Sequence, residues 1–160
     1  MKKFFVSALT LILFFVTGCG ESAENFSASE DKKIPAVEEE VGMKIKILIG
    51  DKIFDSTLED NETTREFVKN LPLEVTMTEL NGNEKYYRFG KNFPSADKKV
   101  GEIHAGDLML YSSSYVVLFY KNFSTSYSYT RLGKIENPEG LEKILGGGNV
   151  KIKFESAKKL

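Results

Sequence analysis

The stretch GDLMLYSSSYVVLFY, residues 106–120, decides the fold class of this chain. It contains two nearly continuous apolar runs on either side of a serine-rich turn. Short runs that are rich in β-branched and aromatic residues are typical of strands. Apolar residues at consecutive positions indicate that both faces of such strands are covered. We therefore expect two central strands here, joined by a tight turn.

The segments around this stretch alternate between apolar and polar residues, which is the pattern of half-buried strands. In the segment 43–50, Ile45 and Ile47 face one side. In the segment 73–80, Leu73, Val75 and Met77 point inward. Gly50-Asp51 and the Asn-Gly-Asn at 81–83 are hairpin turn signals. With the two central strands, the pattern predicts about eight strands, over residues 43–50, 52–58, 73–80, 84–89, 106–112, 114–121, 128–135 and 150–155.

Two helices interrupt the predicted strands. The first, within 61–72, has Asn61 as its cap, an inner stripe of Phe67, Val68 and Leu71, and Pro72 at its end. The second, within 137–148, opens with the Asn-Pro pair at 137–138 and ends in three glycines. Its apolar side consists of Leu141, Ile144 and Leu145.

Short strands with a helix near each end of the domain predict a mainly β fold. We expect a small closed antiparallel barrel of eight strands over residues 43–156, with the two helices at its open ends and a short tail at 157–160. Closure of the barrel removes exposed strand edges.

The amino-terminal segment predicts an export signal and a lipid anchor. A basic start is followed by the apolar residues 4–16, which are fewer than the roughly 20 needed to span a bilayer. Val16-Thr17-Gly18-Cys19 then resembles the lipobox of bacterial lipoproteins. The resemblance implies that residues 1–18 are removed, that the Cys19 sulfur receives a diacylglyceryl group, and that the new amino terminus is acylated, for example with palmitate. An ordinary secretory signal is the alternative.

Residues 20–42 contain seven acidic residues and two lysines but a single aromatic residue. Such a composition cannot bury enough apolar surface to fold. We therefore expect residues 19–42 to be a lipidated cysteine followed by a disordered acidic linker. The folded domain would then be tethered outside the cytoplasm, to the cell membrane or to an outer membrane.

The composition also narrows the classes of partner. No basic block is interleaved with aromatic residues, so nucleic acid is not an expected partner. His104 is the single histidine and Cys19 the single cysteine, so we expect neither a metal site nor a cofactor.

The remaining polar residues of note are expected to have structural roles. His104 is expected to be an exposed loop residue. Asp107, like Asp60 and Asn61, is expected to cap backbone N–H groups, whereas Glu84 and Lys85 are expected to be solvated.

Several segments together resemble the bacterial cyclophilin-like domain family. They are residues 58–80, the Glu84-Lys85 pair, residues 106–120 and the RLGKI run at 131–135. The Asp60-Asn61, Leu71-Pro72, Glu84-Lys85 and Gly106-Asp107 pairs have the family's order and spacing over residues 44–155. The resemblance implies an eight-stranded barrel with two helices, in a family whose members mostly lack a known function.

The resemblance also raises an alternative function, that of a peptidyl-prolyl cis-trans isomerase that assists the folding of secreted proteins. In true cyclophilins an arginine, an aromatic pocket wall and a histidine lie around the proline; here Arg88, Phe119 and Tyr129 are the candidate counterparts. The glutamine of the pocket wall has no counterpart, and the chain has no tryptophan. Prolyl isomerase activity would require Arg88 to point into an apolar groove beside Phe119 or Tyr129. An Arg88 side chain that is solvated or paired elsewhere would argue against this activity.

The leading functional hypothesis is therefore a non-catalytic module that binds a peptide or a small ligand in a cleft of the barrel wall. Tyrosine provides large contact area at a small entropic cost, and the chain has seven tyrosines. Residues 122–128 are expected to be a loop that forms the rim of the cleft. Arg88 and Arg131 could instead stack on tyrosine with a carboxylate partner. The candidate ligand-binding residues are Arg88, Tyr111, Phe119, Tyr120, Tyr127, Tyr129 and Arg131.

Overall fold

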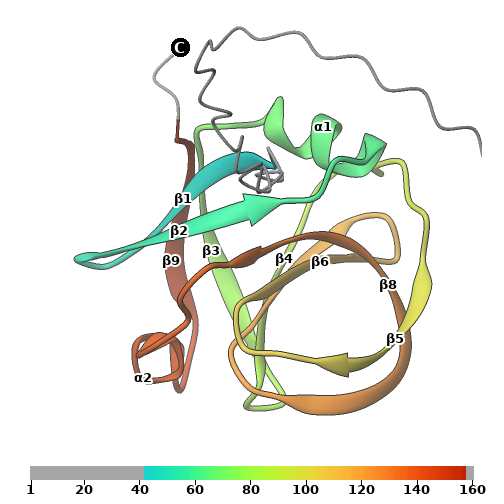
Figure 1. Cartoon of the computed structure of the whole chain (residues 1–160). Helices are drawn as coiled ribbons and strands as arrows, with labels where there is room; N and C mark the ends of the chain where they lie inside the picture. Colours follow the sequence, from blue (N-terminus) through green and yellow to red (C-terminus); the bar gives the residue numbers. More distant parts are fainter. Residues whose placement is uncertain (1–41, 158–160) are drawn as a thin grey trace, which may run out of the picture. The chain divides into compact units, whose positions relative to one another are not determined.

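The computed structural model describes residues 42–157 as nine strands and two helices (Figure 1). The predicted signal peptide, Cys19 and all but the last residue of the predicted linker lie outside the described residues. The first elements are β1 (Met43–Ile49), β2 (Lys52–Leu58), α1 (Glu62–Val68), β3 (Leu73–Leu80) and β4 (Glu84–Arg88). They are followed by β5 (Lys98–Ile103), β6 (Asp107–Tyr111), β7 (Tyr115–Phe119), β8 (Phe123–Ile135), α2 (Leu141–Leu145) and β9 (Val150–Ser156).

The strands form a closed antiparallel barrel of eight strands. Their order is β2-β1-β9-β3-β4-β7-β6-β8, and β8 then pairs with β2 to complete the ring (Figure 1). The closing contact is short, with Ser56 opposite Ile135 and Leu58 opposite Gly133. The prediction of a small, mainly β, eight-stranded barrel with two helices is confirmed.

The barrel interior is the main hydrophobic core. Alternating residues of the strands fill it, including Ile45, Ile47 and Met77, which are fully buried. Both helices contribute: the Phe67 ring of α1 packs edge-on against Phe154, with 5.7 Å between centroids, and α2 buries two leucines. The interior therefore anchors each helix to the barrel.

The central hairpin of β6 and β7 is buried on both faces, as its apolar runs predict. Leu108, Leu110, Val116 and Leu118 belong to the barrel interior. The residues between them face outward and still lie buried, in a second cluster that includes Ile103, Met109, Val117, Phe119 and Tyr129. Another part of the chain must therefore pack against the outer face of this hairpin and shield it from solvent.

The cover consists of β5 and the first half of β8, which the sequence reading missed. β5 pairs with β8 at the edge of the sheet and has no counterpart among the predicted strands. The prediction of a loop at 122–128 is wrong, because β8 begins at Phe123 and runs for 13 residues. Only scattered residues of this pair face the barrel, such as Ile103. This leaves little apolar periodicity for sequence reasoning to detect.

The helix boundaries also differ in part from the prediction. Asn61 caps α1 as expected, since its Oδ1 accepts a hydrogen bond of 2.8 Å from the Thr64 N–H. α2 begins later than predicted, because its cap is Gly140 with φ of 78°. Asn137 instead accepts a hydrogen bond from the Glu139 N–H in the preceding turn.

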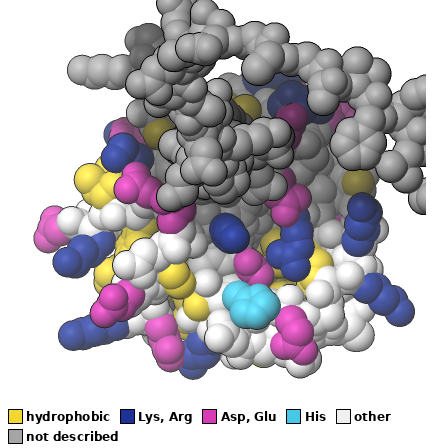
Figure 2. All heavy atoms as spheres, viewed as in Figure 1, with side chains coloured by type: hydrophobic (Ala, Val, Ile, Leu, Met, Phe, Trp, Pro, Cys, Tyr) yellow, Lys and Arg dark blue, Asp and Glu magenta, His cyan; other side chains and the backbone are white. Residues whose placement is uncertain are grey.

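The visible surface of the described part carries mixed charge. Figure 2 shows lysine and arginine side chains interspersed with acidic ones, without a large block of one sign. Within residues 42–157, none of the helices has the length and apolar character needed to cross a membrane.

Candidate functional site

A cleft of about 510 Å³ lies on the outer face of the barrel, beside the cover formed by β5 and β8. We call it the tyrosine cleft, because half of the residues that line it are tyrosines. They come from five strands and the turns next to them. The lining residues are Leu80, Asn81, Glu84, Tyr86, Tyr111, Ser112, Tyr115, Val117, Tyr127 and Tyr129.

The tyrosine rings contact one another at an angle. Tyr111 is the hub, with its ring centroid 5.4 Å from that of Tyr129, 6.1 Å from that of Tyr127 and 6.4 Å from that of Tyr115. The angles between these ring planes are 48°, 80° and 56°, respectively. The rings therefore form walls at different inclinations and do not stack in parallel.

The wall of the cleft next to β8 rests on the cluster under the cover. The buried Tyr129 ring meets Phe119 edge-on, with 5.5 Å between centroids. Burial, together with the nearby Glu84, raises the pKa of Tyr129 to about 12. Its hydroxyl thus remains protonated at neutral pH and is available as a hydrogen-bond donor.

Glu84 contributes the single carboxyl group among the lining residues. Its side chain projects from β4 to the same face as Tyr86, and the residue is only 8% exposed. Among the described residues, this carboxyl group has no hydrogen-bond or ion-pair partner. Burial, and then the charge of Glu79, raises the pKa of Glu84 to about 7. The expectation that Glu84 is solvated is wrong, because this end of β4 lies on the covered face of the barrel, opposite the fully buried Phe119.

Lys85 is also buried, against expectation, but on the opposite face of β4. It forms an ion pair with Glu79 and donates a 2.7 Å hydrogen bond to the Gly148 carbonyl. The Tyr120 hydroxyl donates to the same Glu79 carboxylate, at 2.9 Å. This network closes one end of the barrel interior and is separate from the tyrosine cleft.

The structure thus brings together part of the predicted ligand-binding set. Tyr111, Tyr127 and Tyr129 line the tyrosine cleft, and Phe119 lies beneath Tyr129. Tyr120 belongs to the barrel interior. Arg88 is exposed at the end of β4, with its guanidinium carbon 5.7 Å from the centroid of the Tyr115 ring.

The arrangement that would favour an isomerase is not assembled. Arg88 lies opposite Tyr115 in the β4–β7 register, whereas Phe119 lies opposite Glu84, four residues further along each strand. Arg88 is therefore separated from the Phe119–Tyr129 pair by the length of the hairpin strand. Its position over the Tyr115 ring agrees with the stacking part of the structural alternative, but no ion pair joins Arg88 to a carboxylate among the described residues.

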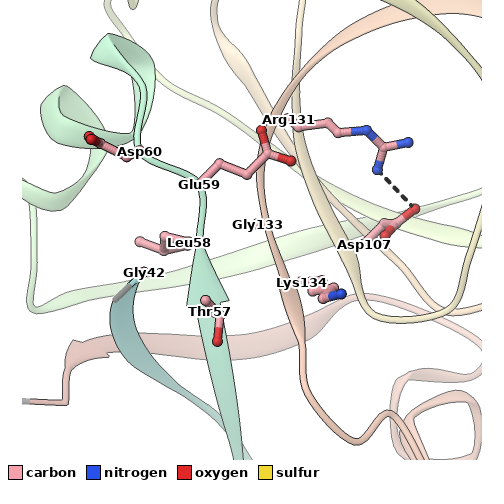
Figure 3. Close-up of a pocket in the computed structure, with 9 residues that line it drawn as sticks. All are labelled: Gly42, Thr57, Leu58, Glu59, Asp60, Asp107, Arg131, Gly133 and Lys134. Atoms are coloured by element: carbon pink, nitrogen blue, oxygen red, sulfur yellow. Dashed lines mark ion pairs between the residues drawn. The ribbon is translucent and has the colours of Figure 1, made fainter. Parts of the chain in front are cut away.

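Arg131 lies in a different depression, of about 700 Å³, where β2 and β8 close the barrel (Figure 3). Its Nη1 is 3.7 Å from Oδ2 of Asp107, which also accepts a 3.0 Å hydrogen bond from the His104 N–H. Asp107 therefore caps a turn, as expected, and holds Arg131 in place. The exposed His104 lies in that turn.

The polar depression has a mixed charge that is mostly compensated within the chain. In Figure 3, Glu59 extends toward the side of Arg131, whereas Asp60 points away. Asp60 instead forms an ion pair with Arg65 of α1. Three of its five charged side chains thus have ion-pair partners, and the other two, Glu59 and Lys134, are of opposite sign. Because these charges largely balance and no aromatic ring lines the depression, it is a weaker candidate for a ligand site than the tyrosine cleft.

Sequence reasoning missed four residues of the tyrosine cleft that matter to its chemistry: Leu80, Glu84, Tyr86 and Tyr115. The last three share the outward parity of β4 and β7, a signal that is present in the sequence. This parity does not by itself predict a cleft, because outward residues of a barrel are ordinarily solvated. Its meaning depends on the packing of β5 and β8 over the barrel, which the sequence does not predict. Within residues 42–157, no group of three histidine, cysteine or acidic side chains is arranged to hold a metal ion.

Comparisons with known proteins agree with this fold. A comparison with curated proteins found no match. The solution structure of a hypothetical protein from Archaeoglobus fulgidus is similar, with a TM-score of 0.50 and 20% identity, over 76% of this chain and 99% of that one. The sequence model of the cyclophilin-like family matches residues 47–155. Because this match spans most of the chain and nearly the whole barrel, the protein belongs to the cyclophilin-like family.

Proposed function

We propose that this protein is a lipid-anchored, extracytoplasmic binding module that holds a peptide or a small ligand in its tyrosine cleft. The observation that carries the proposal is the set of five tyrosines around one cleft, of which Tyr127 is 61% exposed. Tyrosine rings that lie partly open to solvent offer contact area and hydroxyl groups to a ligand. The cleft volume is within the range usual for small-ligand sites.

The framework of the cleft supports binding. Its rings are held by contacts with one another and with the buried cluster under the cover. A ligand would therefore meet a preformed surface, and little ordering entropy would be lost on binding.

The binding proposal can be tested with the full-length protein in a maltoside detergent, labelled with 3-fluorotyrosine. Each of the seven resonances is assigned by a tyrosine-to-phenylalanine variant. Peptide and fragment mixtures should shift the resonances of Tyr111, Tyr127 and Tyr129, while Tyr87, which packs against the barrel interior, serves as the unaffected control. Shifts that never involve the cleft tyrosines would contradict the proposal.

The location proposal rests on residues 1–42 and needs its own test. Cells fed an alkyne-bearing fatty acid should label the wild-type protein. The variant Cys19→Ser should lose the label and accumulate with residues 1–18 still attached. Recovery of unlabelled wild-type protein from the cytosol with Met1 intact would exclude the anchor and the extracytoplasmic location.

A further inference from the structure

We propose that the tyrosine cleft recognises an organic cation, an ammonium group on an alkyl chain, which sits among the tyrosine rings above the Glu84 carboxylate. This inference rests on the proposed function, because it assigns a chemical class to the ligand of the same cleft.

The first argument is the uncompensated carboxyl group. Glu84 is more than nine-tenths buried, lines the cleft and has no polar partner among the described residues. The adjacent lysine, Lys85, points to the opposite face and is committed to Glu79. No lysine or arginine lines the cleft. A buried carboxylate without a partner is unfavourable, so a bound cation would supply the counter-charge that the fold itself lacks there.

The second argument is the aromatic wall. The faces of aromatic rings carry partial negative charge and attract cations placed within about 6 Å of the ring centre. Tyr111 and its three ring neighbours are inclined to one another at 48° to 80°, so that several ring faces and edges surround one space. One cation–π contact of this kind is present at the cleft, where the Arg88 guanidinium lies over the ring of Tyr115.

The two features together favour a cation over an anionic or purely apolar ligand. An anion would be repelled by Glu84 and would find no basic group in the lining. An apolar ligand would displace water from the cleft and give the Glu84 carboxyl group no polar partner in exchange, which is unfavourable. A compact ammonium group with a short alkyl chain suits a cleft of about 510 Å³.

The pKa of Glu84, raised to about 7, makes the expected binding dependent on pH. The titratable and charged groups around it are Glu79 of β3, Lys85 beside it on β4, Tyr120 after β7, and Tyr129 of β8 with the other cleft tyrosines. Of these, only Glu84 has a pKa shifted into the neutral range. Affinity for a cation should therefore rise between pH 6 and pH 8, as the carboxylate forms.

The test uses the full-length fluorotyrosine-labelled protein in a maltoside detergent. Choline and n-butylammonium are the cationic probes, and 3,3-dimethylbutanol is the uncharged match to choline. We expect both cations to shift the cleft resonances and choline to bind about tenfold more tightly than the uncharged alcohol. Tighter binding of choline than of butylammonium would indicate a quaternary ammonium ligand, and the reverse a lysine-like amine.

The decisive variant is Glu84→Gln, which keeps the shape of the side chain and removes its charge. We expect it to weaken choline binding about tenfold and to leave the binding of 3,3-dimethylbutanol unchanged. The matched control is Glu62→Gln, at an exposed position in the first turn of α1, which should change neither. The Tyr87 resonance and circular dichroism establish that each variant is folded.

Three results would overturn the inference, and they differ in what they imply for the proposed function. If the uncharged alcohol binds the cleft as tightly as choline, or if Glu84→Gln leaves choline binding intact, the cation assignment is wrong while ligand binding stands. If neither these probes nor the peptide and fragment mixtures shift any cleft tyrosine in folded protein, both proposals fail.

Discussion

Glu84 of β4 and Phe119 of β7 lie directly opposite each other in the antiparallel register, so that a carboxyl group is set against an aromatic residue on the covered face of the barrel. Phe119 is fully buried and Glu84 nearly so. Burial on this face, followed by the charge of Glu79, raises the pKa of Glu84 to about 7.

The stability of the protein should therefore fall as the pH rises from about 5 to 8. Folded Glu84 retains a proton, up to a pKa of about 7, that the unfolded chain releases near the ordinary glutamate value. Stability decreases wherever the folded state binds more protons than the unfolded state. Because Glu84→Gln mimics the protonated form, it should exceed wild type by roughly 1–3 kcal/mol at pH 8 and by little at pH 5. Urea unfolding followed by circular dichroism measures this difference, and parallel pH profiles for the two proteins would refute it.

The ion pair between the fully buried Lys85 and the half-buried Glu79 should make a large contribution to stability, because removing Lys85 alone leaves the Glu79 carboxylate without its counter-charge. Burial would raise the pKa of Glu79, but the hydrogen bonds from Lys85, Tyr120 and the Gly82 N–H outweigh it, and the pKa is lowered. Its contribution to stability is thus present at neutral pH and lost as the pH falls through that lowered pKa. We expect Lys85→Met to cost about 2–4 kcal/mol at pH 7.

The matched control for that variant is Lys151→Met. Lys151 also pairs with a glutamate, Glu74, but its side chain is 70% exposed. Such surface pairs contribute less than about 1 kcal/mol. Equal losses of stability in the two variants, measured by urea unfolding, would count against the role assigned to Lys85.

Gly133 should be required for closure of the barrel. A Cβ atom at this position would lie 2.3 Å from the Thr57 carbonyl oxygen and 2.7 Å from the Leu58 Cα, both on the facing strand β2. Since backbone atoms cannot yield as a flexible side chain does, we expect Gly133→Ala to cost about 2 kcal/mol or more. Gly90→Ala, where a Cβ would meet nothing within 4 Å, is the control and should be nearly neutral. Thermal unfolding of the two variants decides the point.

The cover of the barrel should be essential for the shape of the cleft. Ile103 of β5 is fully buried in the cluster that contains Phe119 and Tyr129. We expect Ile103→Ala to cost about 2–4 kcal/mol and to shift the fluorotyrosine resonance of Tyr129. Ile53→Ala, at a residue that is 60% exposed, should stay within about 0.5 kcal/mol of wild type and leave that resonance in place. An unmoved Tyr129 resonance in Ile103→Ala would mean that the cover does not hold the cleft.

We expect no prolyl isomerase activity above background, because Arg88 is exposed and lies away from Phe119 and Tyr129 along the hairpin. A protease-coupled assay on a proline tetrapeptide with the full-length protein measures this directly. An acceleration that disappears in Arg88→Ala would reverse the functional assignment from a binding module to an enzyme.

Much of the barrel could be predicted because local patterns suffice for it. The alternation of lysines with Ile45 and Ile47 marks a strand with one buried face. The hairpin turns at Gly50 and at Asn81-Gly82 require positive φ, which the structure has there. The double burial of β6 and β7 follows from their uninterrupted apolar residues. Each of these signals involves residues that are close together in the chain.

The candidate site could not be predicted in the same way, because it is formed by contacts between residues that are far apart in the sequence. Tyr111, Tyr127 and Tyr129 could be selected for their chemistry, but Tyr120, which is equally aromatic and adjacent to Phe119, points into the interior. Arg131 had the right chemistry as well, yet the register of β6 and β8 places it beside Asp107 in the polar depression.

The sequence by itself therefore determined the strands of the barrel ring, apart from the start of β8, together with their turns and the capped first helix, because period-two burial and turn chemistry act over a few residues. Only the tertiary structure decided that β5 and the start of β8 fold over the outside of the barrel. That packing removes water from the ends of β4 and β7 where Glu84 and Phe119 lie, and so turns Glu84 from an ordinary surface carboxylate into a buried group that lines a tyrosine cleft.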